Sequence, residues 1–384
     1  MTITFVSNFL NHHQNPIADV LFTKIGDSYR FISTEPTPES FLNSGYPNCE
    51  KLPYNLLSYK NEIEHNNAMK LILESDIVII GAYNDTIIKF SQARINTGKP
   101  LIKYAERWHK EWKSYLFLPY HILNGNVWRD HISLRNKQVY LFCAGGFVAN
   151  DCNLIGAYPK KRFKWGYFTT VKALQIEDIL NDKKNKKTRM LWVSRFIDWK
   201  HPELPVKLAY YLKNKGFDFQ IDMIGAGVLI NKTQRLIDKL DVADCVSIRG
   251  TMPNNIVIEE MKQSHIYLFT SDRQEGWGAT MNEAMSNGCT VVASNLIGSV
   301  PFLLSEPNTG LIFKSGNIYS LQKKVELLLQ NRELSNDIAR NAYKVMRNIW
   351  SPENASNNLL KLCQAILEDN LDFVKIEEGP CSKA

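Results

Sequence analysis

The chain has 384 residues, which is long for a single hydrophobic core and predicts two domains. Hydrophobic residues make up 44% and charged residues 22%, as in soluble globular proteins, and no apolar run approaches the roughly 20 residues that span a bilayer. The formal net charge of +7 suits anionic partners, but no nucleic-acid-binding module accompanies it, so we expect no nucleic acid.

The start of the chain and its cysteines predict a cytoplasmic protein. Residues 1–7 lack a basic segment followed by an apolar one, so they resemble a first strand and not a signal peptide. The 7 cysteines are odd in number and scattered, without a C-x-x-C pair, which predicts neither a disulfide framework nor a zinc site.

The first half of the chain alternates short apolar segments with helical patterns. Such alternation predicts a parallel sheet with helices on both faces. We expect strands at Ile3–Ser7, Tyr29–Ser33, Asp76–Ile80, Pro100–Tyr104 and Gln138–Cys143, and helices at Asn61–Ser75 and Asp85–Thr97.

The second half repeats this alternation, so the predicted fold class is α/β, with two Rossmann-like, doubly wound parallel-sheet domains that face each other across a cleft. The predicted domains are residues 1–170 and 171–350, and a polar, basic surface loop at Asn181–Thr188 lies near their boundary. We expect strands at Arg189–Ser194, Phe217–Ile224, Cys245–Arg249, Ile266–Thr270 and Thr290–Ala293, and helices at Pro202–Lys215, Asn231–Lys239, Asn254–Gln263, Thr280–Asn287, Leu321–Leu329 and Leu334–Ile349.

Residues 351–384 are predicted to form a C-terminal helix and tail. Ser351 is a candidate N-cap and Pro352 suits the first helical position, so a last helix is expected at Glu353–Glu368, packed back on the N-terminal domain. The residues Lys375–Ala384 are expected to be frayed.

Two basic clusters lie near the domain boundary. Each is either a solvated loop, which we favour for the second, or a region that attracts anionic lipid or a phosphorylated substrate. The first comprises Lys160, Lys161, Arg162 and Lys164, and the second Lys183, Lys184, Lys186, Lys187 and Arg189.

The most informative segment runs from Glu275 to Glu283, with the sequence Glu-Gly-Trp-Gly-Ala-Thr-Met-Asn-Glu. It lies between two apolar segments that are typical of buried parallel strands. The segment predicts a strand, then a loop with Gly276 and Gly278, then a helix that begins on small residues. This arrangement is typical of a site for a phosphorylated ligand, because a helix N-terminus presents unpaired N–H groups and glycines let the ligand approach the backbone.

With this segment the chain resembles the retaining glycosyltransferases of the family 4 type, which have the two-Rossmann-domain architecture called GT-B. The resemblance covers roughly Met190–Asn317 and also includes the segments Leu191–Leu204, Ile221–Gly227 and Val246–Gly250. The first half matches only in its alternation of strands and helices. The resemblance implies a nucleotide-sugar donor, with a UDP-sugar expected, in the C-terminal domain and an acceptor in the N-terminal domain.

Sugar transfer from such a donor requires stabilisation of the negative charge that develops on the leaving diphosphate. The chain contains no Asp-x-Asp metal motif, so we expect no metal and no other cofactor. The resemblance places Arg195 and Lys200 on the diphosphate, as a bidentate group and a point charge respectively. Either residue alone would otherwise be interpreted as a surface cation on a loop.

The resemblance also assigns the residues around the helix. Backbone N–H groups of Ala279 and Thr280 would bind the diphosphate, and Glu283 would accept hydrogen bonds from the ribose hydroxyls. Glu283 could also be only a first-turn carboxylate that complements the helix dipole. Glu275 would lie near the hydroxyls of the transferred sugar, and it is not assigned as a covalent nucleophile. Further candidate donor contacts are Gly276, Trp277, Gly278, Gly225, Arg249 and Gly250.

The first half departs from the family pattern, because the loop after the first strand has no glycine. Either His12 or His13 could meet the acceptor there, although exposed histidines are the commoner case. Glu106 could act as an acceptor-side base or could pair with Arg107 or Arg129. Gly145 could let the backbone approach the donor sugar, or could simply form a tight turn.

The segment Arg107–Tyr120 mixes cations with aromatic residues, and Trp108, Trp112, Tyr115 and Leu116 recur at helical spacing. A basic amphipathic helix with tryptophans suits peripheral contact with an anionic membrane. A helix that packs its apolar face into the core explains the same pattern.

With this resemblance, the predicted function is that of a retaining, metal-independent glycosyltransferase, either cytoplasmic or peripheral on the inner face of the plasma membrane. Its acceptor would be a saccharide or lipid-linked saccharide of a surface polysaccharide. The alternatives are a sugar-nucleotide epimerase on the same architecture and a non-catalytic nucleotide-sugar-binding protein.

Overall fold

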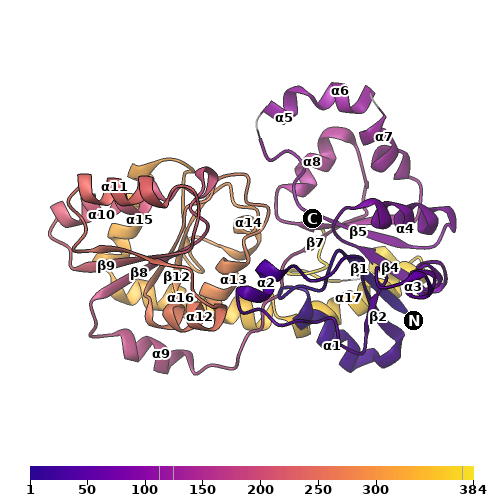
Figure 1. The fold of residues 1–384 in the computed structure, drawn as a ribbon, viewed down its shortest axis with the longest axis horizontal. Helices are drawn as coiled ribbons and strands as arrows, with labels where there is room; N and C mark the ends of the chain where they lie inside the picture. The colour runs from indigo at the N-terminus through magenta and orange to yellow at the C-terminus, as the bar shows by residue number, and fades with distance from the viewer. Residues whose placement is uncertain (112, 124, 374) are drawn as a thin grey trace. The chain divides into compact units, whose positions relative to one another are not determined.

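The structure is a computed structural model that describes residues 1–111, 113–123, 125–373 and 375–384. The chain forms two compact units (Figure 1). Unit 1 comprises Met1–Thr170 together with Ile349–Ala384, and unit 2 comprises Val171–Asn348.

Unit 1 contains a seven-stranded sheet in the order β3-β2-β1-β4-β5-β6-β7, in which neighbouring strands are parallel. The strand order reverses between β1 and β4, which is where ligands bind in doubly wound folds. The strands are β1 (Ile3–Ser7), β2 (Tyr29–Ser33), β3 (Asn55–Leu57), β4 (Ile77–Ile80), β5 (Leu101–Ala105), β6 (Val139–Ala144) and β7 (Arg162–Trp165).

Helices cover both faces of this sheet. On one face, α3 and α4 pack with α8 over the core of Val6, Val78, Leu101 and Leu141, whereas α1 packs against α17. The helices of unit 1 are α1 (Asn15–Ile25), α2 (Glu39–Asn43), α3 (Glu62–Glu74), α4 (Asp85–Asn96), α5 (Lys113–Leu116), α6 (Leu118–Leu123), α7 (Asn126–Asp130), α8 (Val148–Ile155) and α17 (Pro352–Leu367), with 3₁₀ turns at Gly26–Ser28, Ile132–Leu134 and Leu371–Phe373.

The C-terminal helix α17 belongs to unit 1, as predicted, and Ser351 caps it by accepting a hydrogen bond from the backbone N–H of Asn354. The tail after it is not frayed. Cys381 is buried, and the backbone of residues 381–384 exchanges hydrogen bonds with the edge strand β7. The expectation of disorder was wrong because the tail satisfies backbone groups that an edge strand otherwise leaves unpaired.

Unit 2 contains a six-stranded parallel sheet in the order β10-β9-β8-β11-β12-β13. Its order reverses between β8 and β11. The strands are β8 (Thr188–Val193), β9 (Phe219–Ile224), β10 (Val246–Gly250), β11 (Ile266–Phe269), β12 (Thr290–Ser294) and β13 (Leu311–Phe313).

On one face of this sheet α10 packs against α11 and α15, and on the other face α16 packs against α9 and α13 (Figure 1). The helices of unit 2 are α9 (Ile176–Lys183), α10 (Glu203–Asn214), α11 (Ile230–Lys239), α12 (Asn254–Gln263), α13 (Ala279–Ser286), α14 (Val300–Leu303), α15 (Ile318–Gln330) and α16 (Arg332–Asn348), with a 3₁₀ turn η3 at Asp198–Lys200. The two units thus confirm the predicted α/β class with two Rossmann-like parallel-sheet domains.

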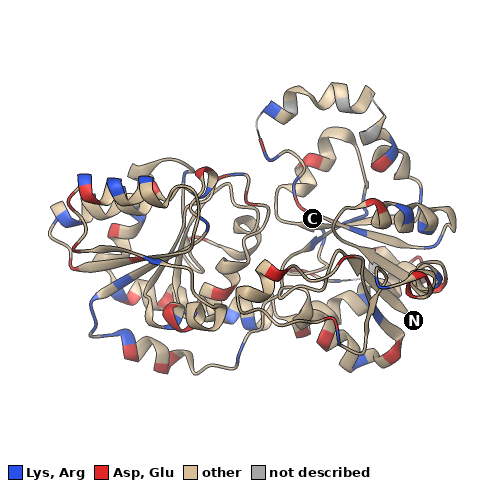
Figure 2. Cartoon of the chain, viewed as in Figure 1, with Lys and Arg blue, Asp and Glu red and all other residues tan. Residues whose placement is uncertain are grey.

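The second basic cluster is not a solvated loop throughout. Lys183 is the last residue of α9, is buried, and donates hydrogen bonds from Nζ to the carbonyl oxygens of Ser264 (2.6 Å) and Gly288 (2.8 Å). Arg189 lies in β8 and forms ion pairs with Asp222 and Glu260. Basic and acidic residues are spread over the helices and loops of both units (Figure 2).

Candidate active site

The segments that follow β8 and β11 lie at the point where the strand order of unit 2 reverses. Because β8 pairs with β11, the residues that follow these strands meet at one edge of the sheet. Lys200 ends the 3₁₀ turn after β8, and Glu275 lies between β11 and α13.

Lys200 and Glu275 form a buried ion pair. Nζ of Lys200 donates a hydrogen bond to Oε2 of Glu275, and Oγ of Ser271 donates to the same oxygen at 3.0 Å. The Lys200 ammonium also lies 4.2 Å from the centre of the Trp199 ring, a cation–π contact. The site therefore holds a cation and a carboxylate side by side, away from water.

The segment that carries Lys200 is fixed to the β11 side by further contacts. The backbone N–H of Asp272 donates to the carbonyl of Trp199 at 2.9 Å, and Thr270 donates to the carbonyl of Lys200 at 2.6 Å. His201 lies between the carboxylates of Glu203 (3.2 Å) and Asp272 (3.6 Å). Hydrogen bonds that the ring donates to Asp272 and Glu203 raise the pKa of His201 to about 9, so the ring is charged at neutral pH.

Helix α13 begins at Ala279 directly after Gly278, which has a φ of 91°. A side chain at Gly278 would collide with the Phe269 ring, since its Cβ would lie 2.3 Å from Cζ. The backbone of Gly276 is packed so closely against Gly298 that a Cβ on Gly298 would lie 1.6 Å from the Gly276 carbonyl oxygen. The glycines thus set the position of the N-terminal N–H groups of Ala279 and Thr280.

Trp277 lies beneath this loop and not on its surface. Its side chain is fully buried, and the indole Nε1–H donates to Oδ1 of Asn282 at 2.9 Å. Ser299 donates to the Trp277 carbonyl at 2.6 Å. In this structure only the backbone of Trp277 can meet a ligand, and its side chain supports the loop.

Glu283 lies in the second turn of α13 and is buried. Burial raises the pKa of this carboxyl to about 7, partly opposed by a hydrogen bond from Asn254. A ligand that donates hydrogen bonds to this buried carboxylate would stabilise its charged form.

Arg195 and Gly225 lie at the same edge of the sheet. The Arg195 guanidinium is 5.6 Å from the centre of the Trp199 ring. The space beside Gly225 is filled by the chain itself, because a Cβ there would lie 1.9 Å from the carbonyl oxygen of Ser194. Close packing of two backbone segments therefore explains this glycine without a ligand.

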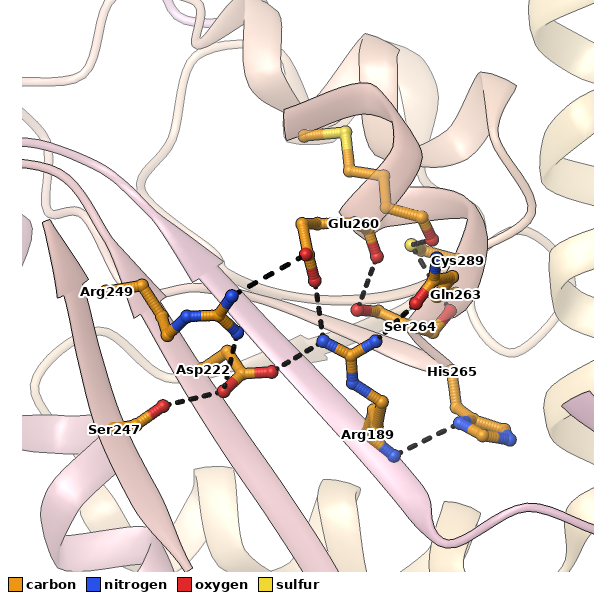
Figure 3. A network of polar contacts seen from close by, with 10 residues as sticks. Arg189, Asp222, Ser247, Arg249, Glu260, Gln263, Ser264, His265 and Cys289 are labelled. Atoms are coloured by element: carbon orange, nitrogen blue, oxygen red, sulfur yellow. Dashed lines mark hydrogen bonds and ion pairs between the residues drawn. The ribbon is translucent and has the colours of Figure 1, made fainter. Parts of the chain in front are cut away.

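The side chain of Arg249 belongs to a network of charged residues that spans strands β8, β9 and β10 (Figure 3). Asp222 accepts from Arg189 at 2.7 Å and from Ser247 at 2.7 Å, and its other contact is Arg249 at 3.7 Å. Glu260 of α12 contacts both arginines. Arg249 is 40% exposed, so its guanidinium remains accessible. The adjacent Gly250 ends β10, with a φ of 69°.

Unit 1 has its own cavity of about 590 Å³ at the carboxyl ends of β1, β4 and β5. His13 and Glu106 line it, as does Tyr167. Glu106 accepts a hydrogen bond from the Tyr167 hydroxyl at 2.5 Å and pairs with Lys110 at 2.9 Å. The partners Arg107 and Arg129 that we considered for Glu106 were wrong, since Arg129 pairs with Asp130 and Arg107 packs on the Phe147 ring.

His12 and His13 are half-buried, so the alternative of simple exposure was wrong. Each ring stacks on a tyrosine, His12 on Tyr46 at 4.0 Å and His13 on Tyr167 at 3.9 Å between ring centres. Burial lowers the pKa of both, that of His12 to about 4, so both rings are neutral at physiological pH.

Gly145 follows β6 in unit 1 with a φ of 116°, which favours glycine. Its N–H donates to the carbonyl of Cys143 at 3.0 Å, as in a tight turn. Such a turn agrees with the simpler of the two interpretations of this glycine.

The segment Arg107–Tyr120 does not form one continuous helix. Trp108 precedes the helices and packs on His131, Trp112 lies outside the described residues, and α5 begins only at Lys113. Trp108 and Leu118 are partly buried against the core of unit 1, as in a helix packed on the core, whereas several other apolar side chains of this region are exposed. They are Leu116 (79%), Phe117 (57%), Tyr120 (59%), Leu123 (85%) and Trp128 (56%).

Sequence reasoning missed two residues that complete these sites. Tyr167 contacts Glu106 from 61 positions away, and no local pattern signals that contact. His201 could have been found, because it directly follows Lys200 and precedes a glutamate by two positions.

Comparisons with known proteins relate this chain to glycosyltransferases. Residues 176–345 match the model of the family described as glycosyl transferases group 1. The solved structure of Alr3699/HepE from Anabaena in complex with UDP has the same fold, with a TM-score of 0.71 and 12% identity over 95% of this chain and 100% of that chain.

Among curated proteins, the chain is similar to the amylovoran biosynthesis glycosyltransferase AmsK of Erwinia amylovora, with 27% identity over 37% of this chain and 36% of that protein. It is also similar to an uncharacterized glycosyltransferase of Haemophilus influenzae, with 28% identity over 39% of this chain and 43% of that protein. The matched stretches thus span less than half of the length of these relatives.

Proposed function

We propose that the protein transfers a sugar from a nucleotide diphosphate donor, a UDP-sugar, to a saccharide or lipid-linked saccharide in surface polysaccharide biosynthesis. The observation that carries the proposal is the buried pair of Lys200 and Glu275, placed where the strand order of unit 2 reverses and beside the N-terminus of α13. The similarity to an amylovoran biosynthesis enzyme supports the polysaccharide role.

The donor would occupy the site in unit 2. Lys200, Arg195 and the N–H groups of Ala279 and Thr280 would stabilise the negative charge that grows on the diphosphate as the anomeric bond breaks. Glu275 would accept hydrogen bonds from hydroxyls of the transferred sugar, and Glu283 from the ribose. Arg249 and Gly250 would lie near the base.

Retention and independence of metal are part of the proposal. The cations at the diphosphate would take the role that a divalent ion plays elsewhere. In front-face transfer the leaving phosphate oxygen helps to deprotonate the acceptor hydroxyl, so no protein nucleophile is needed. Product stereochemistry by NMR tests retention, and turnover that persists in EDTA is expected; loss of turnover that added Mg²⁺ restores would contradict this part.

We further propose that unit 1 contacts an anionic membrane from the cytoplasmic side. The exposed apolar side chains of α5, α6 and α7 lie beside Lys113 and Arg129, a combination that suits a headgroup region. No helix in the described residues is long and apolar enough to cross a membrane.

Flotation with vesicles that contain an anionic lipid tests this contact. The triple variant L116S, F117S and L123S should lose binding, whereas the control I63S, which removes an exposed isoleucine of α3 (71% exposed), should keep it. Equal flotation of both variants would contradict the membrane proposal and leave the proposed reaction untouched.

A panel of nucleotide sugars tests the reaction and its alternatives. A transferase releases UDP when donor and a mixed acceptor extract are both present. An epimerase would change the donor sugar without releasing UDP. A binding protein would be stabilised by the donor, by mass action, without any change in it.

A further inference from the structure

Lys103 of strand β5 is a cation whose neighbours on the adjacent strands are apolar. Lys103 is in register with Ile80 of β4 on one side and with Leu141 of β6 on the other, and both neighbours are buried. Leu101, two positions earlier and so on the same face of the sheet, is buried as well. A cation among these side chains loses hydration, so it needs an interaction that compensates.

The contacts of Lys103 within the chain supply only part of that interaction. Nζ donates one hydrogen bond, to the carbonyl oxygen of Asp130 at 3.0 Å, whereas an ammonium has three donors. None of the ion pairs found among the described residues includes Lys103. The carboxylate of Asp130 is held instead by Arg129, at 2.8 and 3.0 Å.

Lys103 lines the unit 1 cavity, whose volume of about 590 Å³ fits a small organic ligand. Arg129, Asp130 and His131 line the cavity on the α7 side of Lys103, whereas an apolar wall comes from the sheet, from α4 and from the turn after α7. It is formed by Ile80, Ile87, Ile95, Leu134 and Leu141.

The cavity is polar at the carboxyl ends of β1 and β5. Glu106 lies there, bound by Tyr167, and so does Gln14, which is buried. Oε1 of Gln14 and Nδ1 of His13 have no hydrogen-bond partner among the described residues. Buried polar atoms of this kind are satisfied by a ligand that carries hydroxyl groups.

We infer that this cavity binds the sugar acceptor as an amphiphilic phosphate ester. The phosphate contacts Lys103, the apolar group lies on the wall of Ile87, Ile95 and Leu134, and the acceptor hydroxyl lies near Glu106 and Gln14. The inference rests on the proposed function only in naming the ligand as the acceptor. The phosphate can come from a lipid-like ester or from free phosphate, and the experiment separates the two sources.

Isothermal titration calorimetry with n-octyl phosphate, inorganic phosphate and n-octanol tests the inference. Wild-type protein should bind n-octyl phosphate at least about tenfold more tightly than either other probe, because the ester uses both the cation and the apolar wall. K103Q keeps a donor for the Asp130 carbonyl but removes the charge, and it should weaken n-octyl phosphate binding by about tenfold or more. K103R should bind within about threefold of wild type.

K99M is the matched control. Lys99 also donates to carbonyl oxygens at a helix end, those of Leu73 and Glu74, but it is not part of the cavity lining. This variant should bind like wild type. If K103Q does not fold, K103M serves as the second uncharged variant. The comparison of the three probes on wild-type protein tests the inference without any variant.

Equal binding of n-octyl phosphate by K103Q and wild type would overturn the inference. So would equal binding of n-octyl phosphate and n-octanol, or of n-octyl phosphate and inorganic phosphate, by wild type. UDP titrated into the same samples separates the two proposals: failure of UDP to bind, with n-octyl phosphate bound as expected, would contradict the proposed function and leave the phosphate-ester site standing.

Discussion

Nζ of Lys200 donates a hydrogen bond to Oε2 of Glu275, and this buried contact joins the segments that follow β8 and β11. Each charge compensates the other, so both side chains can lie buried. A bound diphosphate would share the cation, and the sugar hydroxyls would share the carboxylate. The pair therefore links donor binding to the chemistry proposed for this site.

Replacing Lys200 should weaken the binding of the nucleotide. K200A removes the cation that faces the diphosphate and leaves Glu275 buried without it, so the affinity for UDP should fall about 10- to 100-fold, with loss of turnover. Calorimetric titration with UDP measures this. The matched control is K262A, since Lys262 forms an ion pair with Glu259 near the surface of α12, and it should leave UDP affinity unchanged; an equal loss in both variants would contradict the role of Lys200.

The stability of unit 2 should depend on pH through His201. Its folded-state pKa of about 9 lies above the ordinary value of 6.5, so its stabilising effect is complete below pH 6.5 and is lost as the pH rises through about 9. Differential scanning calorimetry from pH 6 to pH 10 should show this decrease in wild type.

The variant H201N should flatten that dependence. Asn is chosen because His201 has a φ of 53°, a conformation that Asn tolerates. If H201N loses stability with pH as steeply as wild type, the interaction of His201 with Glu203 and Asp272 is not the cause.

Affinity for UDP should rise as the pH rises through 7, because Glu283 must be ionised to accept hydrogen bonds from the ribose hydroxyls. Burial raises the pKa of this carboxyl to about 7 from an ordinary value of 4.5. Titrations with UDP between pH 5.5 and 8 measure the effect. E283Q should bind more weakly at pH 8, by about tenfold, and with little dependence on pH; an unchanged pH profile in E283Q would exclude the ribose contact.

Removing the last six residues should destabilise unit 1. The tail forms backbone hydrogen bonds to β7 through Cys381, Ser382 and Ala384 and buries Cys381. At roughly 1 kcal/mol for each of these bonds, the free energy of unfolding should fall by about 3 kcal/mol, measured by calorimetry. The full-length control K383S keeps the backbone contacts and should stay within about 0.5 kcal/mol of wild type. A truncated protein as stable as wild type would show that the tail is not part of the fold.

Much of this fold follows from local sequence pattern. Central strands such as Ile77–Ile80 are short, continuous apolar segments because both faces of a parallel sheet are covered. The edge strands Asn55–Leu57, Arg162–Trp165 and Leu311–Phe313 were missed because they are very short or, in β7, carry basic residues. β7 is stabilised by the tail, more than 200 positions away, which no local pattern reveals.

The residues of the candidate sites likewise differ in whether their place can be predicted from nearby sequence. The family resemblance assigned Lys200, Glu275 and Glu283, which lie within or beside single strand–loop–helix segments. The contact of Glu106 with Tyr167 could not be predicted, because the two residues are 61 positions apart in the sequence. Trp277 was expected at the donor, but an indole that fills space beneath a loop looks the same in sequence as one that lines a pocket.

The most direct test of the proposed reaction is the steady-state turnover of E275Q, measured together with its affinity for UDP. The matched control is E259Q, which alters the surface carboxylate that pairs with Lys262. E275Q should lose turnover by about 1,000-fold while its UDP affinity stays within about threefold or becomes tighter, because Lys200 is released for the diphosphate. E259Q should behave like wild type. Unchanged turnover in E275Q would contradict the role of Glu275 in sugar transfer.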